Sequence, residues 1–303
     1  MNVLYAWAQE SFKELDEAEK SLFKEIDTVY SIYLFCMQSL CDLVNYAEDD
    51  LANIRSKFIY KEEHELASDK LLENRVMVSL INNSDLYERV KKEKIAVNLD
   101  RSVIKDIFTS LKTTDTYKEY LLHEERSRKD DLYIIEFLFL DCLISNEVFH
   151  QLMEDHWMSW EEDQSFVVKL ILKTLERASY KPHKNHLISK KSKYWNEEAD
   201  FVKTLLEKTI YNKKTFEEYI NKNTKNWELE RITTLDSILL NMAICELMYF
   251  NNIPARVSLD EYIEIAKEYS TPKSKEFING LLDKIMKDLV NDGTINSKEK
   301  PII

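Results

Sequence analysis

The chain has 303 residues, of which 44% are hydrophobic, and it carries a formal net charge of −13. It contains only 2 glycines and 4 prolines. These are too few for the hairpins and tight turns of a β-rich protein, so the composition predicts an all-α fold. The negative charge excludes nucleic-acid binding through bulk positive charge, and any RNA contact therefore needs a local basic patch.

The apolar runs and the cysteines indicate a cytoplasmic protein without a membrane span. The four cysteines lie on apolar stretches and form no Cys-x-x-Cys pair, which is typical of reduced core residues in a cytosolic protein. Largely apolar stretches such as residues 134–140 and 238–242 are far too short to cross a bilayer.

Hydrophobic periodicity predicts helices throughout the N-terminal and middle parts of the chain. Asp16 can cap the start of a long second helix, and the stretch between 58 and 125 is more polar than its surroundings. The expected helices cover residues 2–12, 16–57, 76–81, 103–111, 116–122, 130–144 and 163–175.

A basic stretch follows, and we place a linker there. Residues 178–195 contain no acidic side chain but five lysines. In so acidic a protein this stretch is a candidate for phosphate contacts, although an ordinary solvated loop explains it equally well. His183 and His186 have no nearby Cys or acid to complete a set of metal ligands, so no metal site is expected.

The C-terminal part is predicted to be compact, with Pro254 and Pro272 separating its last three helices. Glu246 falls on the apolar stripe of the third helix of this part. A carboxylate there needs a partner, either backbone N–H groups or a lysine, and we favour this structural role over catalysis. The expected helices cover residues 196–211, 215–221, 234–250, 258–269 and 273–289.

The last of these helices has an unusual outward face. Gly280 is the only glycine outside the polar tail, and a glycine inside a helix costs about 1 kcal/mol relative to alanine. Opposite the core stripe formed by Ile278, Leu281, Leu282, Ile285 and Leu289, Gly280 has Lys273, Lys284 and Lys287 as neighbours, with Phe277 at the margin. This arrangement suits an RNA strand. The alternative is a solvated face on which the glycine admits a neighbouring helix.

The sequence offers no catalytic constellation. Two glycines cannot supply a phosphate-binding loop or a dinucleotide fingerprint, and no Ser or Cys lies in a recognisable nucleophile motif. We therefore expect neither an enzyme nor a cofactor or metal site.

The C-terminal part resembles the transcription antitermination factors of the NusB family. The order and spacing of the motifs persist across four helices, and Val3-Leu4-Tyr5-Ala6-Trp7 is similar to the end of the family's first helix. The motifs are Trp227-x-Leu229-x-Arg231-Ile232-x-x-Leu235-Asp236-x-Ile238-Leu239, Ala243-x-x-Glu246-Leu247, Ile253-Pro254-x-x-Val257-x-Leu259-x-Glu261, Glu264-x-Ala266-Lys267-x-Tyr269 and Ser274-x-x-Phe277-x-Asn279-Gly280-x-Leu282-Asp283-Lys284.

The resemblance implies two helical bundles, here with an enlarged N-terminal and middle region like that of expanded, roughly 300-residue members. We expect an N-terminal helical region at 1–195, a NusB-like domain at 196–292 and a polar tail at 293–303. The family's first helix begins with an arginine-rich arm, so we expect Met1 to be an internal methionine of a longer helix. Three positions depart from the family pattern. The family usually has a basic residue at the position of Leu240, a glycine at that of Ser270 and an acid near that of Lys273.

The family implies a function in transcription without catalysis. Its members bind box A RNA of ribosomal leader transcripts together with a small-subunit ribosomal protein, NusE, and join elongating RNA polymerase. By motif, Asp236 corresponds to a position facing the protein partner. The expected RNA-binding residues are Tyr5, Lys273, Lys275, Phe277, Asn279, Gly280, Lys284 and Lys287. The alternative is a helical protein-interaction module that keeps the fold but binds little RNA.

Overall fold

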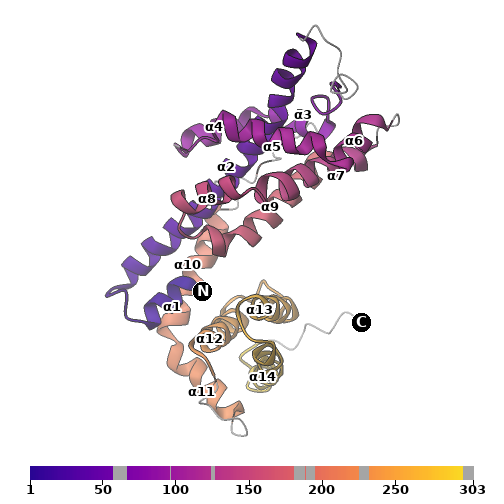
Figure 1. Ribbon diagram of the computed structural model, residues 1–303. Helices are drawn as coiled ribbons and strands as arrows, with labels where there is room; N and C mark the ends of the chain where they lie inside the picture. Colours follow the sequence, from indigo (N-terminus) through magenta and orange to yellow (C-terminus); the bar gives the residue numbers. More distant parts are fainter. Residues whose placement is uncertain are drawn as a thin grey trace. The chain divides into compact units, whose positions relative to one another are not determined.

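The protein is all-α in the part of the chain that the structure describes. The computed structural model describes residues 1–56, 67–95, 97–123, 127–180, 188, 195–224 and 232–295, without the side chains of 180, 195–198, 272 and 273. These residues form α-helices and one π-helical stretch and contain no β-strand (Figure 1). The fold class predicted from the scarcity of glycine and proline is confirmed.

The chain divides into two compact units. Unit 1 comprises residues 1–24 and 192–303, and unit 2 comprises residues 25–191. The division near residue 192 lies close to the boundary expected from the sequence, but residues 1–24 group with the C-terminal helices. They do so because Val3 and Leu4 pack in one apolar cluster with Leu206 and Ile238. The domain boundaries expected from the sequence, which place residues 1–195 in one region, do not include this long-range contact.

Unit 2 is a helical body around the apolar face of α2. Ile32, Tyr33 and Cys36 are fully buried in its core, and the Tyr33 hydroxyl lies 3.0 Å from Thr174 Oγ1 across the unit. Its elements are α2 (Leu15–Arg55, which begins in unit 1), α3 (Arg75–Ile81), α4 (Ser84–Lys92), α5 (Arg101–Thr113), α6 (Asp115–Leu122), α7 (Arg128–Phe137), the π-helix η2 (Leu138–Ile144), α8 (Glu147–His156) and α9 (Trp160–Tyr180).

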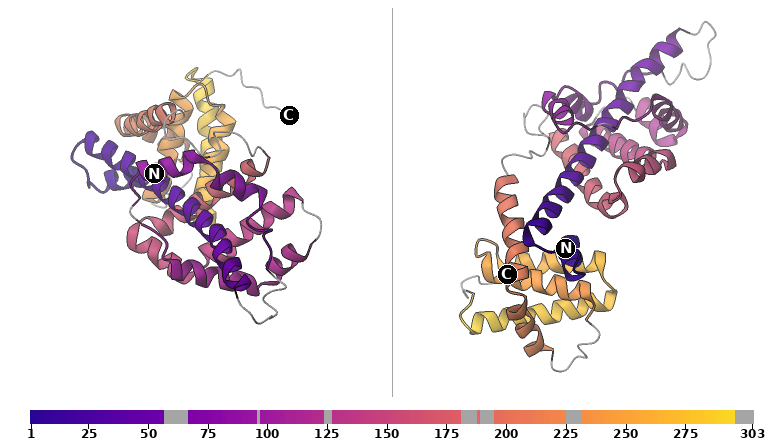
Figure 2. Two further views of the ribbon diagram at one scale, coloured as in Figure 1. Left: turned by 90° about the horizontal axis from the view of Figure 1, so that it is seen from above. Right: turned by 90° about the vertical axis from the view of Figure 1, so that its left-hand side faces the viewer.

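Unit 1 is built around α12, which contacts every other described helix that lies entirely within the unit. Leu239, Leu240 and Ile244 are fully buried on different sides of it. Figure 1 shows α12, α13 and α14 nearly end-on as a three-helix group, and the right-hand view of Figure 2 shows them from the side. The helices are α1 (Asn2–Ala8), α10 (Trp195–Tyr211), α11 (Lys213–Asn223), α12 (Thr234–Tyr249), α13 (Ala255–Tyr269) and α14 (Pro272–Asn291).

Two carboxylates on α12 fix the directions of these helices. Asp236, in the first turn of α12, accepts a hydrogen bond from Ser274 in the first turns of α14, so α12 and α14 start at the same end. Glu246, near the other end of α12, bonds to Ser258 at the start of α13. The helix α13 therefore runs antiparallel to the other two, and α12 and α14 also finish at the same end of the unit.

Candidate nucleic-acid interface

The helix α14 has the inward stripe expected from its periodicity. Thr271 caps its start, because the Thr271 hydroxyl accepts a hydrogen bond from Ser274 N at 3.2 Å, and Pro272 occupies the first turn. The stripe residues Ile278, Leu281, Leu282, Ile285 and Leu289 are all buried. The exposed positions of the helix, which include Glu276, Asn279, Gly280, Lys284 and Lys287, form its outward face.

Gly280 lies on this outward face and has open space around it. If a Cβ atom is built on Gly280, no described heavy atom outside the immediate chain lies within 4 Å of it. A neighbouring helix among the described residues therefore does not explain the glycine, whereas an ordinary solvated face remains the alternative to a binding surface. A bare backbone at an exposed helical position leaves room for a ligand to approach closely.

Two cations near Gly280, Lys284 and Lys287, are exposed, and one of them is neutralised by an acid. Lys287 forms an ion pair with Asp283 at 2.6 Å. Lys284 is exposed and has no carboxylate within 4.0 Å among the described residues, whereas Lys275 is half-buried. Asn279 is exposed beside the glycine and adds a side-chain amide that can donate and accept hydrogen bonds. The side chain of Lys273 lies outside the described part of the chain.

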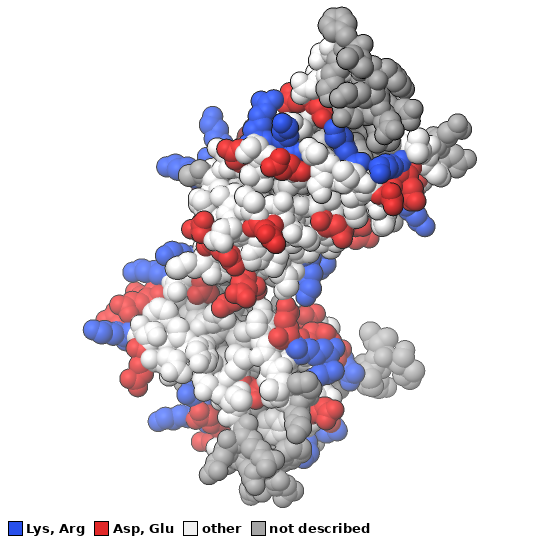
Figure 3. Space-filling model, viewed as in Figure 1, with Lys and Arg blue, Asp and Glu red and all other residues white. Residues whose placement is uncertain are grey.

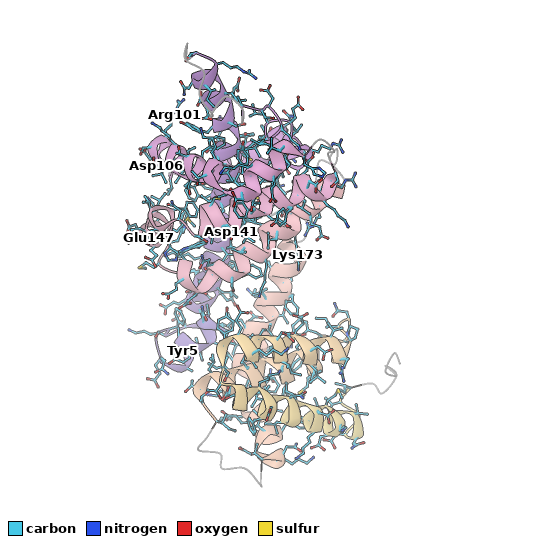
Figure 4. All side chains as sticks on the ribbon, turned by 45° about the vertical axis from the view of Figure 1, so that its right-hand side comes forward. Tyr5, Arg101, Asp106, Asp141, Glu147 and Lys173 are labelled. Atoms are coloured by element: carbon cyan, nitrogen blue, oxygen red, sulfur yellow. The ribbon has the colours of Figure 1, made fainter. Side chains whose placement is uncertain are left out.

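The two aromatic candidates differ in their surroundings. Phe277 is half-buried and packs against the core of unit 1, so part of its ring contributes to folding. Tyr5, on α1, is 45% exposed (Figure 4). Both rings retain exposed surface, but they belong to different helices.

Asp236 is an internal residue. The sequence interpretation placed it on a surface facing a protein partner, but its side chain is only 1% exposed. Its carboxylate accepts hydrogen bonds from Ser270 Oγ at 2.5 Å and Ser274 Oγ at 3.1 Å. Asp236 therefore ties the start of α12 to the turn before α14. Ser270, where the family usually has glycine, supplies one of the two donors.

Glu246 has the structural role that its position on the apolar stripe required. Its carboxylate accepts hydrogen bonds from Ser258 Oγ at 2.7 Å and from the Tyr262 hydroxyl at 3.0 Å. The donors are side-chain hydroxyls of α13 rather than the backbone groups or lysine expected from the sequence. Burial, together with the negative charge of Glu246, raises the pKa of Tyr262 far above its usual value, so the hydroxyl keeps its proton.

Unit 2 offers little that resembles a phosphate-binding surface along its last helices. From Asp130 to Val168, which covers most of α7, η2, α8 and the start of α9, the sequence has ten acidic residues and no Lys or Arg. On the face drawn in Figure 3, basic and acidic side chains of the described residues are interspersed. The lysines at 181, 184, 190, 191 and 193, with His183 and His186, lie outside the described residues.

The comparison with known proteins supports the resemblance. Residues 161–287 match the sequence model of the NusB family. The chain therefore carries a NusB-family domain. The transcription antitermination protein NusB of Salinibacter ruber is 43% identical over 104 residues, which is 34% of this chain and 65% of that relative. The corresponding NusB of Chloroherpeton thalassium is 36% identical over 104 residues, 34% of this chain and 49% of the relative.

The NusB match is partial in both directions. The NusB of Natranaerobius thermophilus is 38% identical over 89 residues, which is 29% of this chain and 64% of the relative. The chain thus spans about half to two thirds of the length of these relatives, and most of unit 2 lies outside the matched family region. No solved structure matches the chain significantly.

None of the described helices combines the length and apolarity needed to cross a bilayer. Within the same described part, no group of three or more His, Cys, Asp or Glu side chains is placed to hold a metal ion.

Proposed function

We propose that this chain is a cytoplasmic, non-enzymatic NusB-type factor that binds box A-like RNA and acts in transcription antitermination. In this proposal the RNA lies along the outward face of α14, and Tyr5, Lys273, Lys275, Phe277, Asn279, Gly280, Lys284 and Lys287 contribute to the site. A small-subunit ribosomal protein of the NusE type and elongating RNA polymerase are its partners.

The observation that carries the RNA site is the open space at Gly280. Nothing in the described fold needs a bare backbone there, yet glycine costs helix stability. The exposed Asn279 and Lys284 lie beside it, and a cation, an amide and an open backbone together suit a sugar–phosphate chain.

The second candidate is a protein-interaction module that keeps the NusB fold but binds little RNA. The net charge of −13 and the acidic run from Asp130 to Val168 favour it, because such a surface repels phosphates and attracts basic protein segments. We therefore expect RNA binding by the protein alone to be weak, and we expect the basic ribosomal partner to tighten it.

A salt-dependent titration with box A-like RNA tests the proposal. On single strands the logarithm of the binding constant falls with the logarithm of salt concentration by about 0.7 per phosphate contact. The double variant Lys284→Gln and Lys287→Gln should flatten this slope. The matched control neutralises Lys105 and Lys129, which are exposed lysines of unit 2, and should leave the slope unchanged.

The titration separates the two candidates. Equal slopes for the double variant and the wild type would show that Lys284 and Lys287 do not contact phosphates, so the RNA would bind elsewhere than on α14. Absence of RNA binding with and without the ribosomal partner, combined with tight binding of that partner, would favour the interaction module.

A further inference from the structure

A second exposed aromatic surface lies in unit 1, away from the outward face of α14. Tyr211, the last residue of α10, is 73% exposed, and Tyr249, the last residue of α12, is 37% exposed. Tyrosine is common at binding surfaces, because its ring combines a large apolar area with a polar hydroxyl. We call Tyr211 and Tyr249, together with Lys208, Lys213 and Lys214, the tyrosine patch.

The rings of the patch are held by defined contacts. Lys208 Nζ lies over the Tyr249 ring, 4.2 Å from its centroid, which is a favourable cation–π geometry. Behind Tyr249, the buried Phe216 packs edge-on with the ring centroids 6.5 Å apart. Tyr211 follows Lys208 by three positions on α10, so the two side chains share one face of that helix. The Tyr249 ring is therefore held in place, with a cation over one of its faces.

The patch contains three lysines, and the acids nearest to them in sequence are Glu207, Glu217 and Glu218. Glu207 is already engaged by Lys203 at 3.8 Å. Lys213 pairs loosely with Glu217 at 3.7 Å. Lys208 and Lys214 have no carboxylate within 4.0 Å among the described residues. Two rings beside unneutralised lysines match the needs of a single strand, whose bases stack and whose phosphates attract cations.

The helix α11 connects the patch with the end of α14. Its first residues follow Tyr211, and Phe216 supports Tyr249. At its other end, Lys222 Nζ lies 3.1 Å from Asp288 and the Asn223 side chain donates to the same carboxylate at 2.9 Å. Asp288 directly follows Lys287. Because α11 has 11 residues, it spans about 16 Å at about 1.5 Å per residue, a distance that a few nucleotides can bridge.

We propose that a single-stranded RNA bound on α14 continues past the end of that helix to the tyrosine patch, where bases stack on Tyr211 and Tyr249 and the three lysines contact phosphates. This inference rests on the proposed RNA-binding function and extends it, because none of the residues expected from the NusB resemblance belongs to the patch. The sequence contained a signal for it in the run Tyr211-Asn212-Lys213-Lys214. Tyr249 is distant from this run in the sequence, and only the fold brings it next to Lys208.

Binding of two RNAs to the full chain tests the extension. One probe is a box A-like RNA, and the other is the same RNA extended at each end by about eight single-stranded uridines. An extension of this length is within the usual site sizes of proteins that bind single strands. Tyr211→Ala should weaken binding of the extended RNA by at least about fivefold, as expected for loss of a base stack. It should leave binding of the short RNA unchanged, since the short RNA does not reach the patch.

The controls separate the patch from the α14 site. Lys284→Gln should weaken both RNAs, and Tyr133→Ala, at an exposed tyrosine of unit 2, should weaken neither. Because Tyr211 is mostly exposed, its removal should not lower the melting temperature. If Tyr211→Ala binds the extended RNA as tightly as wild type while Lys284→Gln weakens both, the extension is wrong and the proposed function stands. If the wild type binds neither RNA, with or without the ribosomal partner, both proposals fail.

Discussion

Ser270 Oγ donates a hydrogen bond to the carboxylate of Asp236 at 2.5 Å, and this bond joins the first turn of α12 to the turn that precedes α14. Ser274 donates to the other carboxylate oxygen at 3.1 Å. The start of α14 is therefore anchored by a buried acid, and the position of the proposed RNA site depends on a residue that does not itself reach the surface.

Asp236→Ala should lower the free energy of unfolding by about 1–3 kcal/mol, because two hydroxyl groups lose their acceptor inside the fold. Urea denaturation of the protein without partner or RNA measures the change. The control is Asp260→Ala, at an exposed acid of α13 that pairs only loosely with Arg256 at 3.5 Å, and its stability should stay near that of wild type. If Asp236→Ala is as stable as the wild type, Asp236 does not stabilise the fold, and the contact with a protein partner expected from the family motif becomes the better explanation.

Tyr262→Phe should cost about 1.5–3 kcal/mol, the usual contribution of a hydrogen bond to a charged group. The hydroxyl of Tyr262 is one of two donors to the buried Glu246 carboxylate, and the substitution leaves only Ser258. Tyr211→Phe is the matched control, since its hydroxyl sits on a mostly exposed ring. A loss of stability as small as that of the control would mean that water or another donor replaces the tyrosine.

Sequence reasoning was most successful where periodicity is strong. The α14 stripe is buried as predicted, because one apolar face per helix is the simplest solution for a helix at the edge of a bundle. It was less successful for α12, where a single inward stripe was expected. This helix lies at the centre of unit 1, so Asp236, Leu240 and Asn241 are buried as well, and polar residues there are recognised only through their partners.

Two other features escaped the sequence for physical reasons. The helix α4 is short and has Leu86 as its one fully buried side chain, so its apolar signal is too weak to separate it from a polar loop. The π-helical stretch η2 follows α7 without a break, and its wider turn does not follow the period of 3.6 residues on which the prediction of one helix at 130–144 relied.

Asp42→Asn should stabilise the protein at neutral pH but less so in acid. Burial raises the pKa of the Asp42 carboxyl to about 6, although a hydrogen bond from Gln38 opposes the shift. Because the folded-state pKa exceeds the ordinary value of about 3.9, the stabilising contribution of this group is complete below that value and is lost as pH rises through about 6. At about pH 7.5 the partly buried, ionised carboxylate therefore lowers the free energy of unfolding, and asparagine removes this penalty.

Urea denaturation at about pH 5 and about pH 7.5 measures this effect. We expect a gain of about 1–2 kcal/mol at the higher pH, a value reduced from the full shift because the carboxyl is partly exposed. Asp106→Asn, at an exposed position of α5 (Figure 4), should show no such pH dependence. An equal gain for Asp42→Asn at both pH values would exclude ionisation as the cause.

Phe277→Leu should separate the folding role of this ring from RNA binding. Because the ring is half-buried against the core of unit 1, Phe277→Ala should lose about 1–3 kcal/mol of stability, less than the full cost of deleting a buried phenylalanine. Leucine keeps most of the apolar contact and loses the aromatic face. RNA binding that is weakened by about fivefold or more in Phe277→Leu would indicate base stacking, whereas wild-type affinity would make Phe277 a core residue only.

Gly280→Ala should move stability and RNA affinity in opposite directions. A methyl group at this position meets open space, and alanine is a better helix former, so the free energy of unfolding should rise by about 0.5–1 kcal/mol. The same methyl group would stand between the helix backbone and an RNA strand, so affinity for box A-like RNA should fall. Thermal melts and RNA titrations of one preparation measure both quantities.

The matched control is Asn279→Ala, which also adds helix propensity at an exposed position of α14 but adds no atom over the bare backbone. Asn279→Ala removes the side-chain amide and should therefore weaken RNA binding through the loss of a hydrogen bond, without placing a new atom in the path of the RNA. Asn279→Ser keeps a hydroxyl that can form a hydrogen bond, so it should bind RNA more tightly than Asn279→Ala. For Gly280, serine should be as harmful as alanine, because both introduce a Cβ. Greater stability with unchanged RNA affinity in Gly280→Ala would show that the open face of α14 is merely solvated.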